Sequence, residues 1–280
     1  MLLALPLMGG VGGGLVSCET IDEGERWTEP APVEMKKNVL VEDFTGQNCV
    51  NCPNAADLLH DLLATTMGEH IVAVGVHGGA LSLNVNKTAM GLATEQGDEY
   101  NTHWGVQSWP AGMIDRTDGN GNVGRTCDFT SWSSAIVGQL SKDLLVDLDA
   151  STTFDAETRQ LHIDVTAEAT EGNSLSADMK LTVWLTESNI TGMQMMPDAS
   201  RNMQYVHNHV LRDVISAPYG DAMTIESNRA TCSYSHTIPT NYGKATAARY
   251  EVKPENMAVV AFVTDKNGEV LQVVDVPVVK

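Results

Sequence analysis

The sequence predicts an α/β domain over residues 38–141, followed by an all-β domain with the architecture of an immunoglobulin-like β-sandwich over residues 142–280. Before Ser141, apolar segments of strand length alternate with segments of helical spacing, which is typical of a sheet flanked by helices. After Ser141, short segments of alternating apolar and polar residues follow one another without helices between them, which favours the sandwich. A length of 280 residues allows one or two domains.

The first domain opens with an apolar strand over residues 39–44, a short polar turn, and the pair Cys49 and Cys52. A helix is expected from Pro53 to Leu63, because proline suits the first helical turn, where its missing N–H is not needed. The N-terminus of a helix stabilises a thiolate and lowers the pKa of a nearby thiol. The C-x-x-C spacing also occurs in zinc sites and structural disulfides, but zinc needs about four ligands and the chain has no second such pair. The pattern therefore favours a redox pair.

The remaining segments of the first domain keep the alternation of strand and helix. In chain order they are an apolar strand at 71–77, a helical segment at 90–101, a strand at 111–115, a turn at 118–121 and a closing helix at 131–140. Trp109 and Pro110 directly precede the strand that begins at Ala111.

The second domain consists of segments with period-2 apolar spacing, which buries one face of a strand and leaves the other in water. These segments are residues 144–149, 160–167, 179–186, 205–211, 258–264 and 270–276, the last two joined by a hairpin turn at 265–268.

The C-x-x-C strand–helix unit, together with the aromatic-Gly-aliphatic stretch that leads to Trp109-Pro110, resembles the thioredoxin fold. The resemblance implies that Pro110 is a cis-proline facing the disulfide and that Trp109 presents its backbone to a substrate. It also implies that Asp43 is the buried carboxylate that helps to move protons at Cys52. The chain departs from the family at Asn48, where an aromatic residue usually precedes the first cysteine.

The beginning of the chain predicts export and lipid attachment. Residues 1–17 are interpreted as a lipoprotein signal peptide, because they are apolar and small and end in a sequence that resembles a bacterial lipobox. Cleavage before Cys18 would leave a thiol for lipid modification, and residues 18–37 would form an acidic linker. An ordinary signal peptide or a buried apolar segment is the alternative. The segment is too short for a membrane-spanning helix, which needs about 20 apolar residues.

The leader, the motif V-E-D-F-T-G-x-x-C-x-x-C-P and the segment from Tyr205 to Arg212 together resemble the Omp28-related (outer membrane protein twenty-eight) lipoprotein family of Bacteroidetes. The likeness covers nearly the whole mature chain. It implies a thioredoxin-like domain and an immunoglobulin-like domain, anchored as an outer membrane lipoprotein that faces the periplasm or the cell surface.

The charge of the chain restricts its partners. The sequence has 17 Lys and Arg against 36 Asp and Glu, a net charge of −19, which repels nucleic acid and anionic lipid headgroups. We therefore expect no nucleic-acid partner, contact with the membrane only through the lipid anchor, and no cofactor. Cys127 and Cys232 remain outside the motif, either as a disulfide between the two domains or as two unpaired buried thiols.

Other candidate sites are weaker. His207 and His209 are two residues apart and could bind a metal from one strand face, but no third ligand has recognisable spacing, so a polar strand face is favoured and no metal is expected. Residues 118–129 begin like a calcium loop but lack its Gly and Glu, which favours a hairpin turn. His77 is expected to be a core or loop histidine.

A cluster of four methionines lies in the long connection from Ile190 to Tyr205. Flexible thioethers suit an adaptable binding surface, whereas simple packing of the loop onto the sandwich is the default interpretation.

The leading hypothesis is a thiol–disulfide oxidoreductase that acts on envelope or surface proteins. Cys49, expected to be the more exposed cysteine, would attack a substrate disulfide, and Cys52 would resolve the mixed disulfide with help from Asp43. Pro110 and Trp109 would shape the peptide-binding groove. The alternative is a non-enzymatic outer membrane or surface lipoprotein, in which the C-x-x-C pair is a structural disulfide and the immunoglobulin-like domain binds a protein or glycan.

Overall fold

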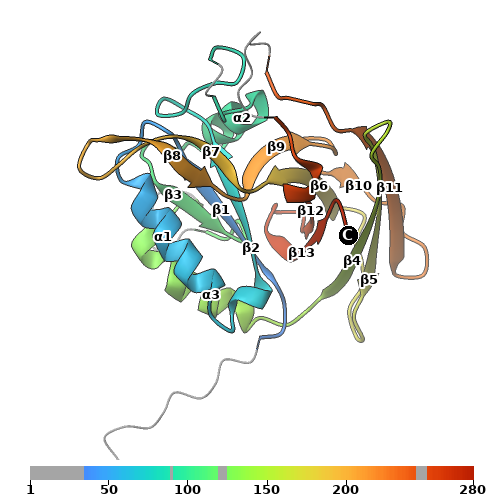
Figure 1. The fold of residues 1–280 in the computed structure, drawn as a ribbon. Helices are drawn as coiled ribbons and strands as arrows, with labels where there is room; N and C mark the ends of the chain where they lie inside the picture. The colour runs from blue at the N-terminus through green and yellow to red at the C-terminus, as the bar shows by residue number, and fades with distance from the viewer. Residues whose placement is uncertain (1–34, 89–90, 119–124, 244–250) are drawn as a thin grey trace, which may run out of the picture. The chain divides into compact units, whose positions relative to one another are not determined.

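A computed structural model describes residues 35–88, 91–118, 125–243 and 251–280 of the chain (Figure 1). The predicted signal peptide, Cys18 and the acidic linker up to residue 34 lie outside the described residues, as does most of the predicted turn at 118–121. The described chain is a mixed α/β structure with mostly β content and several sheets.

The helices and strands have the following bounds. The α-helices are α1 (Cys52–Leu63), α2 (Glu95–His103) and α3 (Trp132–Leu140), and short 3-10 turns lie at Gly68–His70, Phe129–Ser131 and Pro254–Asn256. The strands are β1 (Val39–Thr45), β2 (Ile71–His77), β3 (Ala111–Ile114), β4 (Val146–Asp155), β5 (Gln160–Ala169), β6 (Lys180–Glu187), β7 (Ile190–Met195), β8 (Arg201–His207), β9 (Val210–Val214), β10 (Asp221–Ala222), β11 (Arg229–Thr237), β12 (Met257–Thr264) and β13 (Val270–Pro277).

The largest sheet has eight strands. Seven follow one another in the order β13-β12-β6-β9-β2-β1-β3, and β10 pairs with β6. β2 pairs parallel with both β1 and β9, whereas β3 pairs antiparallel with β1, and β12 pairs antiparallel with β6 and β13. The predicted boundary near Ser141 lies between α3 and β4, and this sheet takes strands from both sides of it.

Alternate residues of β1 face two different apolar cores, as the pleat of a strand requires. Val39 and Val41 pack with buried residues of α1 and α3. Leu40 and Phe44 pack with Tyr100 of α2 and with aromatic residues of β6 and β12. The strand is therefore buried on both sides, which explains why it begins with three consecutive apolar residues, Val39 to Val41, instead of alternating apolar and polar ones.

A second, three-stranded sheet has the order β11-β5-β4 (Figure 1). Apolar residues on one face of β4 and β5 share a core with apolar residues of β6 and β12. The outer residues of β4 alternate with the buried ones along the strand, as the period-2 spacing predicts. Two layers of sheet therefore enclose this core.

The connection between β6 and β9 is a β-hairpin rather than a loop. β7 and β8 pair with each other in a separate two-stranded sheet. The predicted strand over residues 205–211 is wrong at its centre, because His209 has a left-handed backbone with φ of 54°, which separates β8 from β9. Met193 in this hairpin is buried, whereas Met203 is exposed.

The two cysteines outside the motif are not joined. Cys127 is buried and unpaired, and Cys232 is half-buried on β11 and also unpaired. The structure therefore agrees with two unpaired thiols and not with a disulfide between Cys127 and Cys232. Burial raises the pKa of the Cys127 thiol to about 11, so this thiol stays protonated and unreactive near neutral pH.

A buried ion pair joins Glu42 of β1 to Arg116, which follows β3. Arg116 donates two hydrogen bonds to the Glu42 carboxylate, at 2.8 and 2.9 Å, and both side chains are buried. The guanidinium also lies over the rings of Trp104, Trp184 and Phe262, at 4.8 to 5.4 Å from their centroids. The pair therefore connects β1 with residues of β6 and β12.

Replacing Arg116 with Met should destabilise the protein strongly, because the Glu42 carboxylate would stay buried without a partner. We expect a loss of about 3–5 kcal/mol in the free energy of unfolding, measured by urea denaturation. The matched control is Arg229→Met, which removes an exposed pair with Glu168 and should cost at most about 1 kcal/mol. Equal losses in the two variants would contradict the structural role of the buried pair.

Candidate functional site

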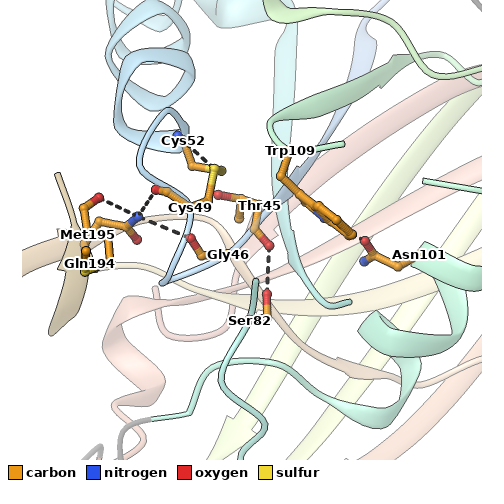
Figure 2. Close-up of a disulfide and its surroundings, with 9 residues drawn as sticks. All are labelled: Thr45, Gly46, Cys49, Cys52, Ser82, Asn101, Trp109, Gln194 and Met195. Carbon is orange, nitrogen blue, oxygen red and sulfur yellow. Dashed lines mark hydrogen bonds between the residues drawn. A yellow bond between two sulfur atoms is a disulfide. The ribbon is translucent and has the colours of Figure 1, made fainter. Parts of the chain in front are cut away.

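The two cysteines of the motif form a disulfide at the N-terminus of α1. Cys49 and Cys52 are bonded to each other, and the backbone N–H of Cys52 lies 3.1 Å from Cys49 Sγ (Figure 2). Pro53 occupies the first helical turn, as the sequence predicts. After reduction, a Cys49 thiolate in this position would accept a hydrogen bond from the helix N-terminus and lie at the positive end of its dipole.

Both cysteines are buried to the same degree. Each has 2% of its surface exposed, so the expectation that Cys49 is the more exposed of the two is wrong. The reason is that strand β7, from the hairpin that the sequence did not predict, lies against the loop that precedes Cys49. The exposed position in this loop is Val50, between the two cysteines.

Hydrogen bonds fix the loop before Cys49 to β7, among them one from the Gln47 side chain to Met193 O at 3.3 Å. Met195 N–H donates to Gln47 O at 2.8 Å, and the buried Gln194 side chain donates to Cys49 O at 2.9 Å and to Gly46 O at 3.2 Å (Figure 2). No feature of the sequence around residue 194 marks it as part of the site, because its partners are backbone carbonyls about 145 residues away.

The Trp109–Pro110 peptide bond is cis, as the thioredoxin resemblance implies. The Trp109 indole N–H donates to Asn101 Oδ1 of α2 at 2.9 Å, and its ring packs against Gly79. Gly79 has a left-handed backbone with φ of 70°, and a Cβ there would lie 2.4 Å from the Trp109 ring, so this position requires glycine. In the view of Figure 2, Trp109 and Gln194 lie on opposite sides of the disulfide.

A cavity of about 350 Å³ lies beside the disulfide, on the side of Cys52. Its walls come from α1, the ends of β1 and β2, and the hairpin; they include Asp43, Cys52, His77, Gln194, Tyr205 and His207. Asp43, the predicted acid–base residue, and Cys52, the second cysteine of the motif, therefore line the same cavity.

Asp43 is a buried carboxyl without a compensating charge. Only 6% of its surface is exposed, and among the described residues nothing donates a hydrogen bond to its Oδ1 atom. Burial raises the pKa of Asp43 from its ordinary value of 3.8 to about 7. This carboxyl can therefore take up and release a proton near neutral pH.

Two histidines line the same cavity, and the sequence assigned neither a role there. The rings of His77 and His207 are 5.4 Å apart, and within the described part of the chain His77 Nδ1 and His207 Nε2 have no hydrogen-bond partner. Burial lowers the pKa of His207 to about 4, and burial together with the charges of His207 and Arg212 lowers the pKa of His77. Both rings are therefore neutral at physiological pH.

The metal hypothesis for His207 and His209 depends on one continuous strand, which β8 and β9 do not form. His209 follows β8, although its side chain also lines the cavity. Over residues 35–88, 91–118, 125–243 and 251–280, no three His, Cys, Asp or Glu side chains are grouped as metal ligands. Half of the calcium-like loop, residues 119–124, lies outside the described residues.

Comparisons with known proteins found one matching family model and similar solved structures. A family model described as outer membrane protein Omp28 matches residues 97–280. No curated protein matches the chain. Among solved structures, HBP35 of Porphyromonas gingivalis is similar with a TM-score of 0.65, over 88% of this chain and 76% of that chain, at 15% identity. At this identity the similarity shows a shared fold. None of the described helices is long and apolar enough to cross a membrane.

Replacing Asp43 with Asn should stabilise the oxidised protein at neutral and alkaline pH. Between about pH 4 and pH 7 the folded protein keeps a proton on Asp43 that the unfolded chain loses, so the free energy of unfolding falls as the pH rises through this range. The variant does not lose stability in this way. Its free energy of unfolding should therefore exceed that of the parent by up to about 4 kcal/mol at pH 8 and by little at pH 4. Denaturation of both proteins at several pH values measures the difference. A constant difference would show that Asp43 titrates normally.

Proposed function

The chain belongs to the Omp28 family of outer membrane proteins, and from this premise we propose that it is a lipid-anchored thiol–disulfide oxidoreductase of the cell envelope. One observation carries the proposal: the Cys49–Cys52 disulfide at a helix N-terminus shares a cavity with Asp43, a buried carboxyl whose pKa is about 7. An ordinary structural disulfide needs no titratable carboxyl beside it.

The proposed architecture has a thioredoxin-like unit over residues 38–141 and an immunoglobulin-like unit over residues 142–280. The first is supported by the parallel pair β1 and β2, the helices α1 and α3 against one face of β1, and the cis bond before Pro110. The second is supported by the two facing sheets, with β4, β5 and β11 on one side of a core and β6 and β12 on the other.

In the reducing direction, a Cys49 thiolate attacks one sulfur of a substrate disulfide. A bond forms between Cys49 and that sulfur, and the second substrate sulfur leaves as a thiolate. Cys52 then loses its proton to Asp43 and attacks Cys49 Sγ, which breaks the mixed disulfide and releases the first substrate sulfur as a thiolate. The substrate gains two electrons, and the Cys49–Cys52 pair is oxidised. The reverse sequence oxidises a substrate dithiol.

The environment of Asp43 fits this role. A carboxyl with a pKa near 7 is ionised in half of the molecules at neutral pH, so it can accept the Cys52 proton and return it. The cavity beside it has room for water molecules, which can exchange that proton with solvent. The substrate is an envelope or surface protein, with an extended segment held beside Trp109 and Pro110.

One observation favours the alternative of a non-enzymatic surface protein. Both sulfurs lie in residues that are only 2% exposed, so a substrate reaches Cys49 only if the nearby loop or hairpin moves. If the disulfide is structural, the facing sheets of residues 142–280 become the part that binds a protein or glycan partner.

The reduction potential of the Cys49–Cys52 pair separates the two functions. The measurement needs a soluble protein that begins after Cys18, with Cys127 and Cys232 replaced by Ser so that a single disulfide reports. A potential between about −120 and −270 mV is expected for an exchange-competent pair. A potential below about −300 mV, or reduction only on unfolding, would show that the disulfide is structural.

The proposed lipid anchor has its own test. Cys18→Ala should move the full-length protein from the membrane fraction to the soluble fraction of cells, because lipid attachment needs the thiol. Cys127→Ala is the matched control and should leave the protein in the membrane fraction. Retention of the Cys18 variant in the membrane would contradict lipid attachment at this residue.

A further inference from the structure

We propose that Gln194 is a positioning residue that sets the reactivity of Cys49 from outside the thioredoxin-like unit. The inference rests on the proposed thiol–disulfide exchange and adds a residue to it that belongs to β7, in the hairpin between β6 and β9. Figure 2 shows the Gln194 side chain extending from β7 to the loop that carries Cys49.

The side-chain amide of Gln194 donates hydrogen bonds to three backbone oxygens. Its Nε2 atom lies 2.9 Å from Cys49 O, 3.2 Å from Gly46 O and 3.2 Å from Met195 O. Two N–H hydrogens are thus shared among three acceptors, all in a site where Gln194 is 2% exposed. Water cannot replace these bonds without opening the site, so loss of the amide costs these buried carbonyls the hydrogen bonds that Gln194 donates to them.

These bonds act on the turn that places the Cys49 sulfur. Gly46 O also accepts the Cys49 N–H at 3.0 Å, so Gln194 bonds both ends of the turn from Gly46 to Cys49. Cys49 Sγ in turn lies 3.1 Å from the backbone N–H of Cys52, in the first turn of α1. A displaced turn would lengthen this last contact, and the Cys49 thiolate would lose its hydrogen bond from the helix N-terminus.

The loop has little room to adjust by itself. On the side away from Gln194, Asn48 N–H donates to Leu81 O at 2.8 Å, and a Cβ on Gly46 would lie 2.6 Å from the same oxygen. The loop is therefore held between Leu81 and β7. Loss of the Gln194 amide removes the hydrogen bonds from β7 to Gly46 O and Cys49 O. The bond from Met195 N–H to Gln47 O stays, so the change is confined to the turn from Gly46 to Cys49, which can then move away from the helix.

The experiment compares the pKa of the Cys49 thiol in two variants. The parent protein begins after Cys18 and has Cys127 and Cys232 replaced by Ser and Cys52 replaced by Ala, so that Cys49 is the single thiol. Gln194→Met keeps the length and neutrality of the side chain but removes its donors. Gln204→Met makes the same change at an exposed position of the same hairpin. The ultraviolet absorbance of the thiolate and the rate of alkylation by iodoacetamide are followed against pH.

The Gln194→Met variant should show a higher Cys49 pKa and about tenfold slower alkylation at pH values below that pKa, which corresponds to a shift of about one pKa unit. Gln204→Met should match the parent. A folded Gln194→Met protein with the parent's pH profile would overturn the proposal. If that variant does not fold, Gln194→Asn, which keeps the amide but shortens its reach, must show the same shift.

Failure of this inference is distinguishable from failure of the proposed function. Disulfide exchange is measured on the same proteins with Cys52 restored. An active protein whose Cys49 pKa does not respond to Gln194 refutes the positioning role alone. An inactive parent refutes thiol–disulfide exchange and the role of Gln194 with it.

Discussion

The buried pair of Glu42 and Arg116 is the constraint on which the rest of the structure depends. A buried carboxylate that stays ionised needs a cation beside it, and Arg116 reaches Glu42 from a segment directly after β3 in which Asp115 and Arg116 have left-handed backbones, with φ of 50° and 53°. This conformation is costly outside glycine, so the ion pair and the aromatic rings around it must hold it in place. The pairing fixes the register of β1, and a shift of one residue would turn Glu42 to the wrong face.

The same register decides the chemistry of the neighbouring residue. Side chains alternate along a strand, so Glu42 on the face toward Arg116 places Asp43 on the face toward α1 and the disulfide. The two consecutive acidic residues therefore have different surroundings. Glu42 is paired with the Arg116 guanidinium, whereas Asp43 is buried without a cation, which raises its pKa. The register of β1 thus places Asp43, the acid–base group of the site, in its buried position. At a pH at which the Asp43 carboxyl is ionised, its burial without a cation destabilises the fold.

Local signals in the sequence predict the part of the site that comes from neighbouring residues. The strand before Cys49, the helix from Cys52 and the cis bond at Pro110 each depend on short motifs, and the structure contains all three. The sequence does not predict the contribution of the hairpin. Gln194 bonds backbone oxygens, which leave no pattern in side chains, and His207 lines the cavity from β8, the second strand of the hairpin. The equal burial of the two cysteines follows from this same hairpin.

The position of β2 in the sheet has a consequence for how the chain is made. Its seven residues are all buried, and one of its edges is covered by β9, where Gly75 lies opposite Val210. Synthesis proceeds from the N-terminus, so this apolar edge is finished 135 residues before its partner exists. At about 5–20 residues per second, the delay is on the order of ten seconds. An unpaired strand edge is a template for pairing with another chain, so the β2 edge is open to aggregation during synthesis until β9 covers it.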